Sequence, residues 1–298
     1  MSAKTAPSPT ADQVRSRVHQ MWGSVAGAWA DHADEVEQRS KAVTQAMIAA
    51  VEPAPGDSVL ELACGAGGLG RAIAAKVAPG GRVLLTDVAP EMVAIAAARA
   101  ERRDEHESAL VTAQVIDLER IGLPDESFDI VVCREGLMFA LDPGRAAREA
   151  SRVVRPGGRV SFAVWGPRDR NPWLGILADA IQEHTGLPVP PPGVPGPFSL
   201  GAHGVLEHTL AGAGLEQVRI EDVAVPTHDN SFEEYWQLRT ALAGPMKKVL
   251  AGLPTETLDA IRETVRQRLS PYSSVSDGLT IPGLAYVGSG RRPTATDR

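Results

Sequence analysis

Hydrophobic and polar residues follow two alternating periods through the middle of the chain. Short apolar runs typical of buried strands are separated by stretches with hydrophobic residues three or four positions apart, which is typical of helices. Near-continuous apolar strands that alternate with helices predict a parallel sheet covered on both faces. We expect strands at Ser58–Leu62, Arg82–Thr86, Ala113–Ile116, Asp129–Cys133 and Gly158–Trp165, and helices at Leu69–Val77, Glu91–Arg103 and Arg145–Val154, the last ended by Gly157.

The flanking segments show other patterns. Residues 13–51 carry Trp22, Val25 and Trp29 at helical spacing, which predicts an N-terminal helical cover. Residues 166–201 include a proline-rich run that cannot form regular ladders and predicts a stiff cover loop. The remaining expected elements are helices at Trp173–His184 and Val205–Ala213, a strand at Glu216–Val225, two helices within 232–269, and a strand at Leu284–Gly288.

These patterns predict one domain over residues 13–290. Its core is expected at 57–165, and a helical lid insertion at 226–280 is expected to lie between the last two strands. Residues 1–12 and 291–298 are rich in Pro, Ser, Thr and Arg, so we expect both to be flexible tails.

Composition narrows the class of protein. The chain has 298 residues, a formal net charge of -7 and two cysteines. An acidic chain lacks the broad basic face of a nucleic-acid-binding protein, and two cysteines are too few for a disulfide framework. No apolar run approaches the ~20 residues of a membrane span, and the N-terminus has no signal-peptide core. We expect a cytoplasmic protein without a membrane span, whose oligomeric state is open, a homodimer included.

A glycine loop follows the first expected strand. Gly65–Gly70 matches G-x-G-x-x-G, a turn that lets the backbone approach a ligand and enter a helix. Both dinucleotides and S-adenosylmethionine bind such loops. Glu61, four residues before Gly65, would repel a pyrophosphate. S-adenosylmethionine has no phosphate, and an acidic residue can serve its ammonium and sulfonium groups, so the loop favours this cofactor.

The segment from Val59 to Gly70 resembles motif I of the class I S-adenosylmethionine-dependent methyltransferases. It is close to the small-molecule branch that includes the UbiE/COQ5-like quinone methyltransferases, known as methyltransferase type 11. The family pattern is acidic-x-G-x-G-x-G, and Ala63 stands where the first glycine is usual. The resemblance implies a Rossmann-like, doubly wound α/β fold. Its seven-stranded sheet would be mostly parallel with an antiparallel last strand, and would carry helical lid insertions.

Further motifs of the family follow in order. Asp87 resembles the residue that binds the ribose hydroxyls, Met92 the residue packed on the adenine, and Asp117 the acceptor from the adenine amino group. Arg155–Gly158 resembles the turn before the fifth strand. The cofactor-binding residues implied by the resemblance are Trp29, Glu61, Ala63, Cys64, Gly65, Gly67, Asp87, Val88, Met92, Asp117, Leu118, Cys133 and Arg134.

The sequence contains fewer features that indicate which residues bind the methyl acceptor. Candidates for contact with it are Trp22, Glu135, Met138, Phe139, Trp236 and Arg239. His203 and His208 are weak candidates for a catalytic base, and no histidine spacing indicates a metal site. Since the cofactor is already activated, catalysis is expected to rest mainly on positioning.

The sequence therefore predicts an enzyme that methylates a small, apolar or aromatic metabolite of the quinone or secondary-metabolite type and releases S-adenosylhomocysteine. One alternative is a cofactor-binding member of the same fold with pericyclic, decarboxylation or regulatory function. Another is a nicotinamide oxidoreductase that uses the literal glycine motif, which Glu61 disfavours.

Overall fold

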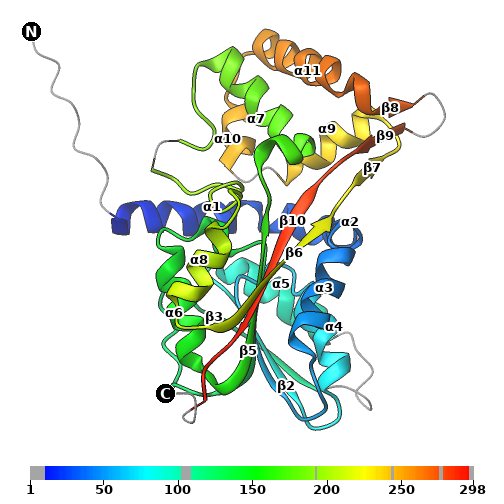
Figure 1. The fold of residues 1–298 in the computed structure, drawn as a ribbon. Helices are drawn as coiled ribbons and strands as arrows, with labels where there is room; N and C mark the ends of the chain where they lie inside the picture. Colours follow the sequence, from blue (N-terminus) through cyan, green and yellow to red (C-terminus); the bar gives the residue numbers. More distant parts are fainter. Residues whose placement is uncertain (1–10, 102–108, 192, 243–244, 275–277, 295–298) are drawn as a thin grey trace, which may run out of the picture.

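A central seven-stranded sheet organises the computed structural model, which describes residues 11–101, 109–191, 193–242, 245–274 and 278–294 (Figure 1). Its strand order is β3-β2-β1-β4-β5-β10-β6. Neighbouring strands are parallel except β10, which is antiparallel to both β5 and β6. The strands are β1 Ser58–Glu61, β2 Arg82–Asp87, β3 Leu110–Val115, β4 Phe128–Arg134, β5 Val154–Trp165, β6 Glu216–Ala224 and β10 Leu284–Arg291. The predicted fold class is thereby confirmed.

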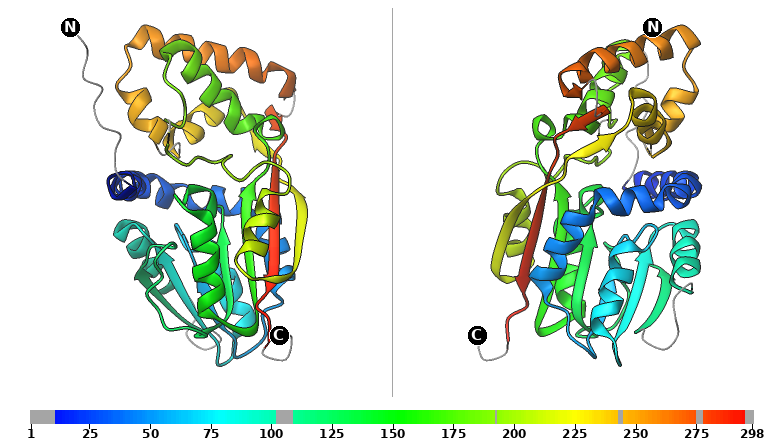
Figure 2. Two further views of the ribbon diagram at one scale, coloured as in Figure 1. Left: turned by 60° about the vertical axis from the view of Figure 1, so that its left-hand side comes forward. Right: turned by 90° about the vertical axis from the view of Figure 1, so that its right-hand side faces the viewer.

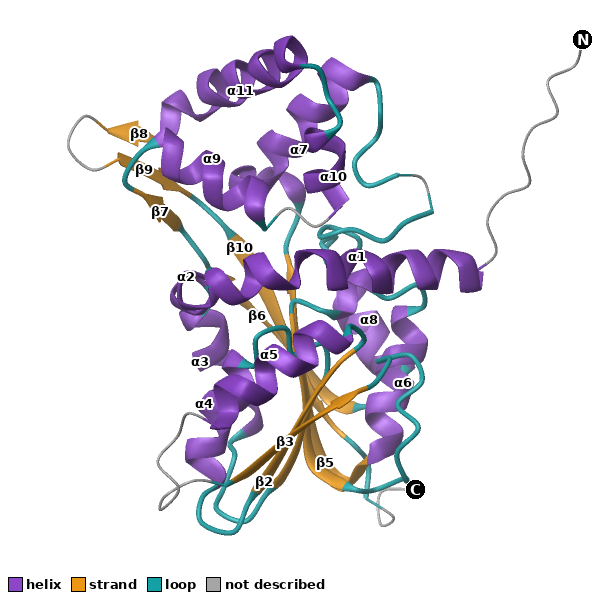
Figure 3. Ribbon diagram, turned by 180° about the vertical axis from the view of Figure 1, so that it is seen from behind, coloured by secondary structure: helices purple, strands orange, loops and turns teal. Residues whose placement is uncertain are grey.

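Helices cover both faces of this sheet. α3 (Lys41–Val51), α4 (Gly68–Val77) and α5 (Pro90–Glu101) lie on one face, as Figure 3 shows, and α6 (Pro143–Val153) and α8 (Val205–Gly212) cover the other. The sheet is buried from both sides, and residues such as Ile130, Val131 and Phe162 have no exposed surface. This explains why the strands read as continuous apolar runs.

One expected helix end is wrong. α6 stops at Val153, and β5 begins at Val154, which pairs with Phe128. Gly157 therefore does not end a helix. It lies in β5 with φ +75°, and its N–H donates to the carbonyl of Arg292 (2.8 Å). The left-handed backbone that glycine adopts easily serves a bend in a strand here.

A cap stands above the carboxyl ends of the parallel strands (Figures 1 and 2). It contains α7 (Pro172–Thr185) and the segment 226–280. We expected that segment to be helical with two helices at 232–269, but its described residues form three α-helices and a small antiparallel sheet in the order β7-β9-β8. These strands are two to four residues long, which is too short for an alternation of apolar and polar residues to be recognised in the sequence. The elements are α9 Phe232–Ala241, α10 Pro245–Ala251, α11 Thr255–Leu269, β7 Thr227–Asp229, β8 Ser273–Ser274 and β9 Gly278–Ile281.

The N-terminal cover consists of α1 (Ala11–Asp31), α2 (Ala33–Arg39) and α3 rather than one continuous helix. α1 runs crosswise between the sheet edge and the cap, as both views of Figure 2 show. Three short 3-10 turns, at Leu137–Phe139, Arg168–Arg170 and Ser270–Tyr272, complete the described elements.

The C-terminal boundary also differs from the expected one. Arg291 lies in β10 rather than in a tail. Arg292 donates to the carbonyls of Ser151, Arg152 and Val154 and forms an ion pair with Glu126 (2.9 Å). The expected tail 1–12 falls mostly outside the described residues.

Asn171 joins the cap to the sheet. Its fully buried side-chain amide donates to the carbonyls of Gly166, Pro167 and Leu284 at 3.0–3.2 Å. Its side-chain oxygen accepts from the N–H of Leu284 (3.0 Å) and from the indole of Trp173 (3.2 Å). One side chain therefore connects the end of β5, the start of α7 and the start of β10.

We expect Asn171→Ala to lower the free energy of unfolding by about 2–4 kcal/mol, because it leaves several buried polar groups without partners. Asn230, whose bonds to Glu234 are exposed, provides the matched control, and Asn230→Ala should cost less than about 1 kcal/mol. Denaturant unfolding measures both values. Equal costs for the two variants would contradict this role of Asn171.

Candidate functional site

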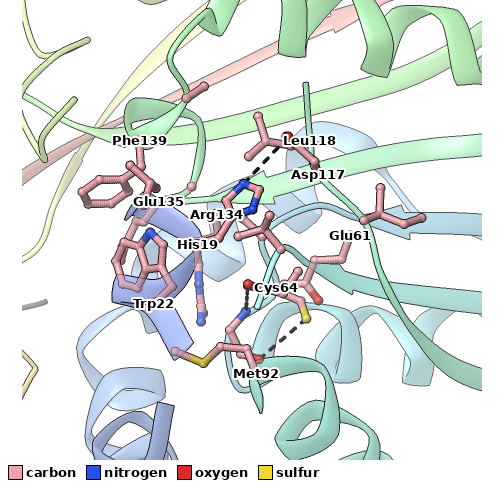
Figure 4. A pocket seen from close by; sticks show the side chains of 18 of the residues that line it. His19, Trp22, Glu61, Cys64, Met92, Asp117, Leu118, Arg134, Glu135 and Phe139 are labelled. Carbon is pink, nitrogen blue, oxygen red and sulfur yellow. Dashed lines mark hydrogen bonds and ion pairs between the residues drawn. The ribbon is translucent and has the colours of Figure 1, made fainter. Parts of the chain in front are cut away.

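A first cavity opens at the carboxyl ends of β1, β2 and β4, beneath α1 (Figure 4). It encloses about 1040 Å³ of empty space, including its mouth. Open α/β sheets bind ligands at this edge. Most of the predicted cofactor-binding residues line it: Trp29, Glu61, Ala63, Cys64, Gly65, Asp87, Val88, Met92, Asp117, Leu118 and Arg134.

Alternate residues of the loop after β1 have a left-handed backbone conformation. Ala63, Gly65 and Gly67 have φ values of +50°, +52° and +78°. This region favours glycine, so Ala63, the departure from the family pattern, keeps the backbone path at some steric cost. Gly136 makes room for its methyl group, because a Cβ placed on Gly136 would lie 2.4 Å from the Cβ of Ala63.

The side chain of Glu61 stabilises the end of this loop through a hydrogen bond. Its side chain is 2% exposed, and one of its oxygens accepts from the N–H of Gly70 (2.8 Å) at the start of α4. Its carbonyl accepts from the hydroxyl of Thr86 (2.7 Å). Burial raises the pKa of Glu61 to about 8, although the positive charge of Arg134 and the Gly70 bond act in the opposite direction.

Asp87 closes β2 and faces the loop. Its carboxylate accepts from the N–H groups of Gly65 and Ala89, both at 3.0 Å. Each bond uses a different oxygen, so each oxygen retains acceptor capacity toward the cavity. Burial raises the pKa of Asp87, against these hydrogen bonds.

Asp117 is held partly by α1. Its carboxylate lies 3.3 Å from Nε of Arg15 and 3.9 Å from Nε2 of His19, and it accepts from the N–H of Glu119 (2.8 Å). Arg15 also forms an ion pair with Glu119 (2.8 Å). These contacts tie α1 over the first cavity, so a ligand on Asp117 would share that carboxylate with Arg15.

Arg134 and Glu37 form the other polar wall. Arg134 donates to both oxygens of Glu37 (2.8 and 3.0 Å) and to the hydroxyl of Thr44 (2.6 Å). Hydrogen bonding to Glu37 raises the pKa of Arg134 against desolvation, so Arg134 is charged. Glu37 had no motif to mark it.

Five predicted site residues line neither this cavity nor the adjoining second one. Successive residues of a strand point to opposite faces, so Cys133 is buried in the core while Arg134 reaches the first cavity. Gly67 is the N-cap residue of α4. Trp236 lies on α9 near Phe232 (ring centroids 6.1 Å apart) and packs against the core, partly buried. His203 and His208 are exposed beside α8, which packs on a sheet face instead of its edge.

A second cavity of about 1040 Å³, again including its mouth, adjoins the first between α1 and the cap. Its walls are largely apolar and aromatic. The sequence predicted Trp22, Glu135, Met138, Phe139 and Arg239 as acceptor contacts, and all line it. Further lining residues that no motif marked include Met21, Arg39, Trp165, Arg168, Trp173 and Phe198.

Trp22, Trp29, Glu135 and Phe139 line both cavities and therefore mark their junction. Figure 4 shows Trp22, Glu135 and Phe139 on one side of the first cavity and Glu61 on the other. The rings of Trp22 and Phe139 meet edge to face (4.9 Å). The indole N–H of Trp29 is buried with no acceptor among the described residues. Two ligands could meet at this junction.

Two kinds of feature are missing from the described ranges. No group of three His, Cys, Asp or Glu side chains there is placed to hold a metal ion. None of the helices described is both long enough and apolar enough to cross a bilayer.

Comparison with known sequences identifies relatives of this core. Residues 60–162 match a family model described as a methyltransferase domain. The ubiquinone/menaquinone biosynthesis C-methyltransferase UbiE of Cupriavidus metallidurans is 31% identical over 161 residues, which cover 46% of this chain and 65% of that protein. The chain thus spans slightly less than two thirds of this curated relative.

Comparison with solved structures extends the likeness beyond the core. The YcgJ protein of Bacillus subtilis has a TM-score of 0.57 at 18% identity, covering 85% of this chain and 98% of that one. The [4+2]-cyclase SpnF has a TM-score of 0.56 at 22% identity, covering 97% and 98%. These likenesses concern the fold.

The raised pKa of Glu61 predicts a pH-dependent stability. Between its ordinary pKa of 4.5 and about 8, folded Glu61 holds a proton that the unfolded chain releases. Glu61 therefore makes the fold less stable as the pH rises through this window. Glu61→Gln keeps an acceptor for Gly70 and removes the titration. We compare the free energy of unfolding of this variant with that of the wild type. The difference, variant minus wild type, should increase by about 1–3 kcal/mol between pH 5.5 and 8.5.

Denaturant unfolding at the two pH values measures this difference. Glu207→Gln, which removes an exposed carboxylate on α8, is the control and should show no such growth. An advantage of Glu61→Gln that is the same at both pH values would show that Glu61 does not titrate in this window.

Proposed function

We propose that this chain, which belongs through residues 60–162 to the class I S-adenosylmethionine-dependent methyltransferases, transfers a methyl group from that cofactor to a small, apolar or aromatic acceptor. The family match confirms the resemblance read from motif I. S-adenosylmethionine is accordingly the cofactor. The observation that carries the proposal is the junction of two cavities, one lined by the cofactor motifs and one largely apolar.

The first cavity fits this cofactor chemically. Its carboxylates, Glu37 and Asp87 among them, suit a ligand with an ammonium and a sulfonium group. The free acceptor capacity of Asp87 suits two ribose hydroxyls. Met92, 2% exposed, offers an apolar surface for the adenine. The unpartnered indole N–H of Trp29 gives the cavity a further donor.

The second cavity supplies the acceptor site in this proposal. Met138, Phe139, Trp173 and the loop around Phe198 form its apolar walls. Ser199 fixes this loop by donating its hydroxyl to the carbonyl of Met138 (2.6 Å). Such walls exclude water and restrict the orientation of a flat or apolar ligand.

The protein's contribution to the reaction is positioning. S-adenosylmethionine supplies an activated methyl group, so no nucleophilic side chain of the protein is required. Holding two reactants in line is worth about 7–11 kcal/mol. Glu135, which lines both cavities, is the carboxylate placed to orient the acceptor or receive its proton. Its backbone is fixed with φ +59° by the N–H bond to the carbonyl of Ala163 (2.8 Å).

The family match favours methyl transfer over the alternative of a cofactor-binding protein with other chemistry. Formation of S-adenosylhomocysteine during turnover with a metabolite extract distinguishes the two. A cytoplasmic location, a homodimer, and a free metabolite instead of a nucleic acid as acceptor stay predictions from the sequence.

We expect Asp87→Ala to weaken binding of S-adenosylhomocysteine about tenfold or more, because a buried carboxylate that orients the ligand and the Gly65 loop is lost. Calorimetric titration measures the affinity. Asp222→Ala, which removes an exposed carboxylate of β6, should bind like the wild type. No binding to the wild type, or unchanged binding to Asp87→Ala, would overturn the assignment of this cavity.

A further inference from the structure

The two adjoining cavities differ in the charge of their linings. The first contains six carboxylates and two arginines, namely Glu37, Glu61, Asp87, Asp117, Glu119 and Glu135 with Arg15 and Arg134. The second contains three arginines, Arg39, Arg168 and Arg239, and a single carboxylate, Glu135 at the junction. An acidic cavity suits the cationic cofactor. The charge of this cofactor does not explain why the second cavity has more arginines than carboxylates.

Two of the three arginines make hydrogen bonds to protein groups. Arg239 contacts both carboxylate oxygens of Asp229 (3.1 and 3.4 Å), and both side chains are almost fully buried. Arg168 pairs with Asp179 and donates to the carbonyl of Gly175 (3.4 Å). These pairs satisfy their charges within the cap.

Arg39 differs from both. Its side chain is 12% exposed, and its nearest carboxylate oxygen, on Glu135, lies 3.7 Å from Nη2, beyond hydrogen-bond distance. Its Nε is buried with no acceptor. Within the described ranges its guanidinium, which has five N–H donors, makes no hydrogen bond.

Aromatic rings hold this guanidinium in place. Its central carbon lies 5.0 Å from the ring centre of Trp173 and 5.7 Å from that of Trp165. Cation–π contacts of this kind stabilise the charge but accept none of its hydrogen bonds. Burial lowers the pKa of Arg39 to about 10, against the attraction of Glu135, so the side chain stays charged at neutral pH.

A buried charge without hydrogen bonds is costly, and a ligand that supplies acceptors recovers that cost. We propose that the methyl acceptor is an aromatic or otherwise apolar molecule that carries an anionic oxygen group, and that Arg39 binds this group in the second cavity. Calling the ligand the methyl acceptor rests on the proposed function. The preference of Arg39 for an anionic group is independent of the proposed function.

The same lining excludes other acceptor classes. A cationic amine would meet Arg39, Arg168 and Arg239 and only one carboxylate. A wholly apolar molecule would leave the donors of Arg39 without acceptors. The aromatic walls disfavour a small polar acid, because it would not bury the rings of Trp165, Trp173 and Phe198.

Two probes with one ring system test the proposal on the full chain. 8-Anilinonaphthalene-1-sulfonate carries an anionic oxygen group, and N-phenyl-1-naphthylamine has the same rings without it. Both fluoresce in apolar cavities, so titration gives their affinities for the wild type and for three variants. The variants are Arg39→Gln, Glu135→Gln, and the control Arg17→Gln, which removes an exposed arginine on α1.

We expect Arg39→Gln to weaken binding of the sulfonate about tenfold or more and binding of the neutral probe less than about twofold. Arg17→Gln should change neither affinity. Glu135→Gln should tighten binding of the sulfonate only, because it removes a carboxylate 3.7 Å from Arg39 that repels and competes with an anion.

A structural role for Arg39 gives another pattern. Equal losses of both probes in Arg39→Gln, or no loss of the sulfonate, would overturn the proposal. If Arg39→Gln fails to fold, Glu135→Gln decides alone, because unchanged or weaker sulfonate binding in that variant contradicts the proposal.

Calorimetry with S-adenosylhomocysteine on the same proteins separates this inference from the proposed function. Arg39 does not line the first cavity, so Arg39→Gln should bind S-adenosylhomocysteine like the wild type. Failure of the wild type to bind it would overturn the proposed function and leave the probe comparison as the test of Arg39.

Discussion

Two buried carboxylates that accept backbone N–H groups hold the loop on which the rest of the site depends. Asp87 binds the N–H of Gly65, and Glu61 binds the N–H of Gly70, so the loop between β1 and α4 is fixed at both ends. Burying these two carboxyl groups costs solvation energy, which raises the pKa values of Glu61 and Asp87. Asp87 and the other carboxylates of the lining, such as Glu37 and Asp117, make the first cavity suited to a cationic ligand. Asp87 thus both holds the loop and contributes to the preference for this cofactor.

The sequence predicted this part of the molecule well. The strands are buried on both faces, so their apolar runs were plain, and the motif residues sit at strand ends where a ligand can reach them. The side chain of Cys133 points into the core, because successive residues of a strand face opposite sides, and its contact with the cofactor stays a prediction. Arg134, its neighbour, lines the cavity as expected.

The acceptor side was harder to predict. Arg39 ends a seven-residue helix, and Trp173 lies far along the chain, so neither belongs to a local pattern. They meet only because Asn171 fixes α7 over the sheet and α2 reaches the same space. Trp173 and Trp236 both lie on expected helices, and the sequence does not show which aromatic side chain faces the cavity. Only the packing of α9 shows which face meets the cavity.

We propose that the first cavity binds S-adenosylmethionine and not a dinucleotide, although its loop matches G-x-G-x-x-G. Calorimetric titration of the wild-type chain with S-adenosylhomocysteine and, separately, with NAD distinguishes these two ligands. We expect saturable binding of one S-adenosylhomocysteine per chain and no binding of NAD. Binding of NAD without binding of S-adenosylhomocysteine would rule out this assignment of the cavity.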